Sequence, residues 1–295
     1  MKRIRSAFFL SVLLTLHLGI LIPACSFCAT PERKVRVDIA PLPFRSGTML
    51  LEERVLKIND GENKVESTKG IQSLALRYQQ RVNLSRRVQS AENEDVMVED
   101  HAEDMAIYFA TPPQINEQPG ILARQHLHAR KRLGLWLYEP QDRKPDNALN
   151  AALLKLSWMS SLLDVVPAGI GTQQRTTGET WKTDFPVPRG RQKGTLILSG
   201  YECTLVAVED VQGVPHARIA VQGTLNVEQP TYAGAGSLAF TGHVLRRLKD
   251  RLDVETKLSG SLSFTGPVTE VGGTPATLKL KLPCELHRTL RIKLR

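Results

Sequence analysis

The strongest constraint on the fold is an alternation of apolar and polar residues in the C-terminal part of the chain. Between Gly236 and Phe264 most even positions are apolar or glycine, and most odd positions are polar. A period of two puts the two sets on opposite faces of a β-strand, and a slip of one residue would set apolar side chains against polar ones. The stretch therefore predicts half-buried strands with a fixed register.

Within this stretch a short phrase occurs twice, as "GSLAFTG" at 236–242 and "GSLSFTG" at 260–266. The polar cluster 246–251 separates the copies, and a turn centred on Asp250 keeps even positions opposite even ones. The pairs predicted by this turn are Leu238 with Leu262, Phe240 with Gly260 and Gly236 with Phe264. An aromatic side chain opposite a glycine covers bare backbone and lets a sheet bend. We interpret the repeat as two facing strands of one hairpin, with Phe240 and Phe264 pointing inward, and not as a ligand motif.

Residues 146–166 break the strand pattern. Asp146 can accept hydrogen bonds from the first backbone N–H groups of a helix. Apolar residues then follow at helical spacing: Leu149, Ala152, Leu153, Leu156, Met159 and Leu163. Pro167 and Gly169 are expected to end the helix. The broad apolar stripe predicts a helix that packs on a sheet.

The remaining segments indicate one β-rich domain over residues 30–295. N-terminal strands cover 33–139, with "NDG" at 59–61 as a turn, and a meander covers 176–295, with its last two strands expected at 277–282 and 289–295. The regular spacing of strands and turns predicts a curved antiparallel meander, half-barrel-like, and thus a mainly β fold with one packed helix (α+β). Such a shape can hold an apolar ligand between sheet and helix.

The N-terminus has the layout of a secretory signal peptide over residues 1–28. Lys2, Arg3 and Arg5 precede an apolar run at 7–22, and small residues follow Pro23. The run is short for a membrane span of about 20 residues, and no later segment approaches that length. We therefore expect an exported protein of the periplasm or cell envelope, with no transmembrane span in the mature chain.

Two cleavage sites are open. Cleavage after Cys28 would follow the small-residue pattern of ordinary signal peptides. The sequence 22–25 also resembles a bacterial lipoprotein signal, in which Cys25 would carry a lipid anchor. In either case Cys203 and Cys284 remain in the mature chain, on the apolar faces of their strands. They could form a disulfide in an oxidising compartment or stay as two buried thiols.

The chain shows no catalytic signature and no cofactor motif. His126 and His128 are a weak candidate metal pair, because residues two apart on a strand share a face. They lie in the basic stretch 124–132, which would repel a cation, so a solvated basic edge is the favoured interpretation. We also hypothesise that the acidic stretch 92–104 lies near this basic stretch and that the two screen each other.

Composition limits the partners. Aromatic residues make up 5% of the chain, which weakens any role in stacking bases, so no nucleic-acid partner is expected. The net charge is +9; removing Lys2, Arg3 and Arg5 from the 39 basic residues leaves 36 against 30 acidic residues, or +6. This mildly basic surface is compatible with an anionic envelope surface as partner.

The segment 160–190 contains the box Gly178, Glu179, Thr180 and Trp181, and strands of the pattern G-[ST]-L-x-F follow it. This arrangement resembles a family of exported bacterial proteins known only as a domain of unknown function. The resemblance covers the C-terminal half to two-thirds of the chain, and the N-terminal part departs from it. It implies a signal peptide, a β-rich fold and an envelope location, and it supplies no catalytic residues.

These patterns together predict a non-enzymatic envelope protein, which binds a lipid or other apolar ligand or acts as a structural or assembly factor. Two alternatives remain. One is an extracytoplasmic hydrolase whose site is assembled from distant residues, such as His126 or His243 with acidic side chains. The other is a binder of anionic surface polymer, whose binding would depend steeply on salt.

Overall fold

The computed structural model describes residues 34–39, 45–58, 62–68, 70–73, 78–92, 95–111, 114–119, 121–132, 135–142, 144–183, 195–229, 234–269 and 275–293. Residues 34–295 group into one compact unit. The predicted signal peptide, with Cys25 and Cys28, lies outside the described residues.

Antiparallel strands and one helix, α1 (Asn147–Gly169), make up most of this unit. The strands before the helix are β1 (Arg36–Asp38), β2 (Met49–Ile58), β3 (Glu62–Ser67), β4 (Gly70–Ser73), β5 (Tyr78–Glu92), β6 (Asp95–Thr111), β7 (Gln114–Pro119), β8 (His126–Arg132) and β9 (Leu135–Pro140). Those after it are β10 (Gln174–Thr176), β11 (Thr180–Lys182), β12 (Thr195–Val211), β13 (Val214–Gln229), β14 (Gly234–Arg247), β15 (Leu252–Thr269) and β16 (Pro275–Ile292).

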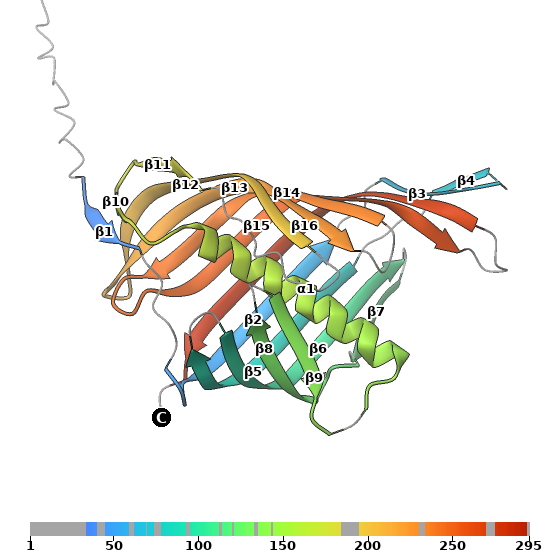
Figure 1. Ribbon diagram of the computed structural model, residues 1–295, viewed down its shortest axis with the longest axis horizontal. Coiled ribbons are helices and arrows are strands. Elements are labelled where there is room, and N and C mark those ends of the chain that lie inside the picture. Colours follow the sequence, from blue (N-terminus) through green and yellow to red (C-terminus); the bar gives the residue numbers. More distant parts are fainter. Residues whose placement is uncertain are drawn as a thin grey trace, which may run out of the picture. The chain divides into compact units, whose positions relative to one another are not determined.

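The large sheet has the order β11-β12-β13-β14-β15-β16-β2-β5-β6-β8-β9, with β3, β4 and β7 off this path. A separate small sheet pairs β1 with β10. Figure 1 shows the large sheet curving around α1, which crosses its inner face. In the described residues β11 and β9 end the order without pairing to each other, so the sheet stays open. The predicted fold class, mainly β with one packed helix, is confirmed.

The register of the repeated phrase is the predicted one. Leu238 pairs with Leu262, Phe240 with Gly260 and Gly236 with Phe264. Phe240 is buried, whereas the side chain of Phe264 lies outside what the structure describes. On the other side of β14, Gly223 of β13 also pairs with Phe240. The ring centroids of Phe240 and Tyr201, which lies on β12, are 6.3 Å apart. The aromatic ring thus has a glycine on both neighbouring strands.

The glycines of this hairpin are required by the approach of the two backbones. A Cβ atom on Gly242 would lie 2.0 Å from the carbonyl oxygen of Lys257, and one on Gly260 would lie 2.1 Å from that of Ala239. Both distances are far below van der Waals contact, so no side chain fits at either position without moving a strand. The glycines therefore set how closely β14 and β15 pack.

The last strand differs from expectation. The segments 277–282 and 289–295 are predicted as separate strands, yet β16 runs unbroken through Pro283. One edge of β16 pairs with β15. The opposite edge pairs with β3 up to Lys281 and with β2 from Cys284 onward. Pro283 lies between these two paired stretches, where its missing N–H costs no ladder hydrogen bond. β2 and β3 consequently follow each other along β16 and do not form a hairpin.

The helix begins as predicted and ends later. The Asp146 side chain accepts a hydrogen bond of 2.8 Å from the Leu149 N–H. The helix continues through Pro167 to Gly169, beyond the predicted end at residue 166. Carbonyl groups at this end are hydrogen-bonded by side chains from the sheet: Tyr201 Oη to Val166, Arg246 Nη2 to Pro167 and Trp181 Nε1 to Ile170. These contacts satisfy exposed acceptors of the last turn and extend the helix past its proline.

We expect Gly260→Ala to lower the free energy of unfolding by about 1–3 kcal/mol, because the added methyl group overpacks the β14–β15 contact. Ser259→Ala, at the exposed neighbouring position, is the matched control and should change stability little. Urea unfolding followed by circular dichroism measures both. Equal stabilities for the two variants would contradict this account of the glycine.

Candidate functional site

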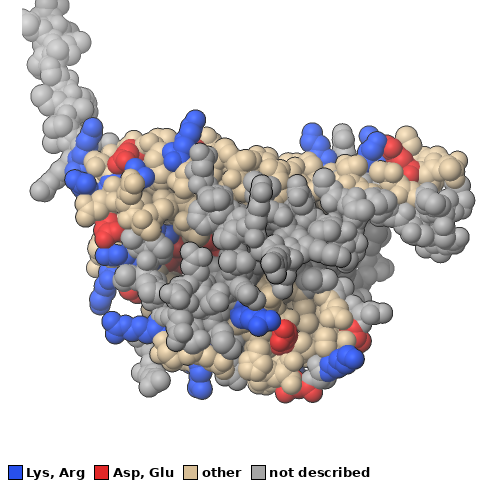
Figure 2. Space-filling model, in the orientation of Figure 1, with Lys and Arg blue, Asp and Glu red and all other residues tan. Residues whose placement is uncertain are grey.

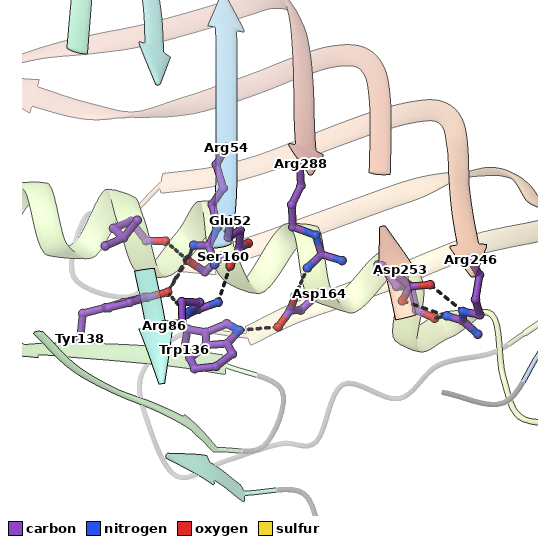
Figure 3. A network of polar contacts seen from close by, with 12 residues as sticks. Glu52, Arg54, Arg86, Trp136, Tyr138, Ser160, Asp164, Arg246, Asp253 and Arg288 are labelled. Carbon is purple, nitrogen blue, oxygen red and sulfur yellow. Dashed lines mark hydrogen bonds and ion pairs between the residues drawn. The ribbon is translucent and has the colours of Figure 1, made fainter. Parts of the chain in front are cut away.

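A buried polar network lies between the sheet and α1 (Figure 3). We call it the arginine network. Its members come from β2, β5, β9, β16 and α1: Glu52, Arg54, Arg86, Trp136, Tyr138, Ser160, Asp164 and Arg288. Charged side chains are rarely buried unless they are paired. This concentration of them under the helix makes the region the leading candidate for a site.

Glu52 is the centre of the network. Its Oε1 accepts from Arg54 Nε and its Oε2 from Arg86 Nη1, each at 2.6 Å. Burial alone would raise the pKa of this carboxyl, but the charges of Arg54 and Arg86 outweigh it and lower the pKa to about 2. Glu52 therefore stays ionised, and a single carboxylate serves two buried guanidinium groups.

Tyr138 and Ser160 connect this centre to the helix. The Tyr138 hydroxyl lies 3.2 Å from Arg54 Nη1, 3.0 Å from Arg86 Nη2 and 2.9 Å from the Ser160 hydroxyl. Arg54 Nη1 also donates to Ser160, whose own hydroxyl donates to the Leu156 carbonyl one turn earlier. The middle of α1 is thereby fixed against β2 and β9.

Asp164 makes a second connection, one helical turn further. It accepts from Trp136 Nε1 of β9 and from Arg288 Nη1 of β16. Arg86 lies over the Trp136 ring, 4.5 Å from its centroid, in a cation–π contact. Two strands that are far apart in the sheet order thus hold the same helical carboxylate.

Near the end of α1, Arg246 forms a further buried contact. It makes a bidentate pair with Asp253, at 2.6 and 3.0 Å, and donates to the carbonyls of Ile39 and Pro167. The pair secures the helix C-terminus to β14 and β15. The negative end of the helix dipole also stabilises the positive charge of Arg246 there.

Two hollows adjoin these elements. One, of about 450 Å³, lies on the outer face of the sheet over β2, β5, β15 and β16. The other, of about 750 Å³, lies between the first half of α1 and β9 and is open to solvent; we call it the α1–β9 cavity. Its lining consists of Arg130, Leu137, Tyr138, Glu139, Pro140, Gln141, Asp142, Lys144, Pro145, Asn150, Leu153 and Ser157. Tyr138 belongs both to this lining and to the arginine network.

The candidate metal pair lies at the surface. His126 and His128 are exposed on β8. In the backbone register His126 faces position 101 of β6, and His128 faces position 99. The described residues contain no group of three ligands placed to hold a metal ion. The register does confirm that the acidic stretch of β6 lies beside the basic stretch of β8; whether the two screen each other stays a prediction.

The structure contradicts a disulfide between Cys203 and Cys284. Both thiols are buried, as expected from the faces they occupy, and both are free. Cys203 lies on β12 and Cys284 on β16, with β13, β14 and β15 between them. Neighbouring strands are about 4.8 Å apart, so the two residues are separated by far more than the 7 Å that a disulfide allows. Burial also raises the pKa of each thiol, which leaves both unreactive.

The Gly178–Trp181 box is structural. Trp181 is buried, donates to the Ile170 carbonyl, and has Arg175 over its ring at 4.5 Å. Glu179 accepts from Arg175 Nη1 and from the Thr176 N–H. The box therefore attaches the chain after the helix to β12 and offers no free functional group.

A histidine cluster on the outer face escaped sequence reasoning. Glu255 of β15 lies 3.0 Å from His243 of β14 and 3.5 Å from His287 of β16, and Lys257 also contacts it at 2.9 Å. These residues lie on adjacent strands at positions of the same parity, and that parity was the available signal. Lys257 lies on the same strand as Glu255, and the contacts across strands, to His243 and His287, become ion pairs only when the histidines are protonated.

No family model matches the chain, and no curated protein matches its sequence. Among solved structures the chain is similar to DynF from the dynemicin biosynthesis pathway of Micromonospora chersina, at 10% identity and a TM-score of 0.18, over 86% of this chain and 85% of that chain. A likeness at this level carries no information about function. No helix among the described residues is long and apolar enough to cross a membrane, as the sequence predicted.

We expect Glu52→Gln to lower the free energy of unfolding by about 3–5 kcal/mol, because it leaves two buried guanidinium groups without their shared carboxylate. Glu53→Gln is the matched control. Glu53 points to the other face and forms an exposed pair with Arg81 at 3.3 Å, so its loss should cost less than about 1 kcal/mol. Denaturant unfolding at pH 7 compares the two variants, and equal losses would remove the central role given to Glu52.

The same carboxylate predicts a pH dependence. Its pKa falls from 4.5 in the unfolded chain to about 2 in the folded protein. Its contribution is therefore complete above pH 4.5 and is lost as the pH falls towards 2. The stability difference between the parent protein and Glu52→Gln should shrink over that window. A difference that stays constant from pH 7 to pH 2.5 would contradict the assignment.

Proposed function

We propose that the protein is an exported, non-enzymatic binder of an apolar or amphipathic ligand, and that the ligand occupies the α1–β9 cavity. The observation that carries this proposal is the cavity itself. Its volume of about 750 Å³ falls within the range of about 300–1,000 Å³ that is usual for small-molecule sites. The space lies between α1 and β9, the strand that ends the order of the curved sheet. From the sequence we expect a ligand between sheet and helix.

The chemistry of the lining supports an amphipathic ligand. Leu137, Leu153 and the Tyr138 ring offer apolar surface, and charged residues of both signs, including Arg130 and Glu139, stand around them. Polar or charged side chains make up seven of the twelve lining residues, so the cavity suits a ligand that carries polar groups along with its apolar part.

The N-terminal sequence supports export. Lys2, Arg3 and Arg5, the apolar run and the small residues up to Cys28 favour a cleaved signal peptide, and Cys25 offers lipid anchoring as the alternative. A ligand-binding domain of this kind would work in the periplasm or cell envelope.

Other functions have weaker support. The hydrolase alternative could draw on His243 beside Glu255, but Glu255 is also held by His287 and Lys257, so His243 does not have this carboxylate to itself. Figure 2 shows Lys and Arg interspersed with Asp and Glu over the described part of one face, without a continuous basic patch there. That distribution gives little support to binding of an anionic polymer.

Asn150→Trp should abolish ligand binding. Asn150 is an exposed helix residue in the cavity lining, so a large ring there fills the cavity without entering the core. The probe is N-phenyl-1-naphthylamine, whose fluorescence rises in apolar sites. Lys182→Trp, at an exposed position on β11 outside the lining, is the control and should bind the probe like the parent. Parental binding by Asn150→Trp would reject this cavity as the site.

Export predicts a specific mature mass. Expressed with its full N-terminus in a bacterium, the chain should lose residues 1–28 and be recovered from the envelope fraction, as intact-mass spectrometry can measure. A mass that begins at Cys25 with added acyl chains would establish the lipid-anchored alternative. Retention of the complete chain in the cytoplasm would contradict export in either form.

A further inference from the structure

Three buried donors of the sheet's inner face lack hydrogen-bond partners within the described residues. They are Arg54 Nη2, Arg288 Nε and Thr256 Oγ1. Arg54 and Thr256 are 0% exposed and Arg288 is 5% exposed. An unpartnered buried polar group is destabilising, and such groups are rare in native proteins. Three on one face of one sheet therefore require an explanation.

The three residues form a single row. Thr256 of β15 pairs with Arg288 of β16, and Arg288 pairs with Arg54 of β2. Directly opposite residues point to the same face with Cβ atoms about 4.5–5.5 Å apart. The three residues thus stand side by side on three consecutive strands, on the face that α1 covers. We call these residues the Thr–Arg–Arg row.

The other contacts of the two arginines fix the row in place. Arg54 uses Nε for Glu52 and Nη1 for Tyr138 and Ser160, while Arg288 uses Nη1 for Asp164. Each guanidinium is therefore oriented by a carboxylate or hydroxyl on one side and keeps a donor on another. Figure 3 shows both groups extending from their strands towards the helix.

We propose that the Thr–Arg–Arg row is a binding site for a carboxylate group. The unpartnered atoms carry four hydrogens: two on Nη2, one on Nε and one on the hydroxyl. An ionised carboxylate has two oxygens with about four acceptor positions, which matches this number. Its negative charge also offsets the repulsion between two neighbouring buried guanidinium groups, and charge-assisted hydrogen bonds to arginine are among the strongest in proteins.

The ligand class follows from the position of the row, in a step that rests on the proposed function. Tyr138 lines the α1–β9 cavity, and its hydroxyl lies 3.2 Å from Arg54 Nη1. Tyr138 therefore stands between Arg54 and the cavity, and no residue of the row belongs to the cavity lining itself. A monocarboxylate with an apolar chain, such as a fatty acid, would place its chain in the cavity and reach the row with its head group when the Tyr138 side chain moves aside.

Calorimetric titration of the purified protein with dodecanoate, dodecanol and acetate tests this assignment. Dodecanoate should bind at least about tenfold more tightly than dodecanol, because the alcohol lacks the charged acceptor. Thr256→Val and Arg288→Lys should each weaken dodecanoate binding by about tenfold and leave dodecanol binding unchanged. Arg291→Lys, the same change at an exposed position of β16, is the control and should bind like the parent.

Thr256→Val also separates binding from folding. Without ligand, the variant removes an unpartnered hydroxyl from the core and should keep or raise the melting temperature. With dodecanoate, its melting temperature should rise less than that of the parent. A variant that folds stably and still binds dodecanoate as tightly as the parent would overturn the proposal.

The two proposals fail in different ways. Equal binding of dodecanol and dodecanoate, unaffected by the row variants, would overturn the carboxylate site and leave the cavity function intact. Equal binding of acetate and dodecanoate, without binding of dodecanol, would support the carboxylate site and remove the apolar-ligand function. Absence of binding by both carboxylates would overturn the site.

Discussion

The structure depends above all on the carboxylate of Glu52, which holds two buried arginines beneath the only helix of the described fold. Burying these charges carries a desolvation cost of several kcal/mol per ion, and apolar residues of similar size can be equally stabilising. The distinctive effect of the network is that it fixes the position of α1 along the sheet. Ser160 and Asp164 are one helical turn apart, so a shift of the helix along the sheet would separate both from their arginines.

The hairpin of β14 and β15 could be predicted in register because its information is local. Apolar and polar residues alternate at most positions of each strand, and a short polar turn leaves few pairings that keep parity. The arginine network was missed although its residues carry a signal. Glu52 and Arg54 occupy positions of inward parity in β2, and Arg86 does so in β5. In the sequence, these charged residues interrupt the apolar face of their strands. Their pairing depends on partners from distant strands, which the sequence alone does not bring together.

Tertiary contacts account for the other differences. Pro167 is a valid helix-ending signal, yet donors from β11, β12 and β14 reach the last carbonyls and hold the final turn in helical form. Pro283 likewise favours the end of a strand, but its position between β2 and β3 spares any ladder bond. The pairing of β16 with β2 joins the C-terminal meander to the N-terminal strands. Nothing local in either segment specifies that junction. The separation of Cys203 from Cys284 has another cause, the order of the C-terminal meander, which places β13, β14 and β15 between β12 and β16.

The inner face of the sheet therefore combines two kinds of polar contact with different consequences. Contacts through Glu52, Asp164 and Asp253 are complete pairs, which explains how charge is tolerated under the helix. The Thr–Arg–Arg row is incomplete, and each unpartnered donor costs about 1–3 kcal/mol. Against a typical net stability of about 5–15 kcal/mol, three such donors are a large loss for a purely structural element. A bound carboxylate removes that loss with the same atoms, which makes recognition a better physical account of the row than packing.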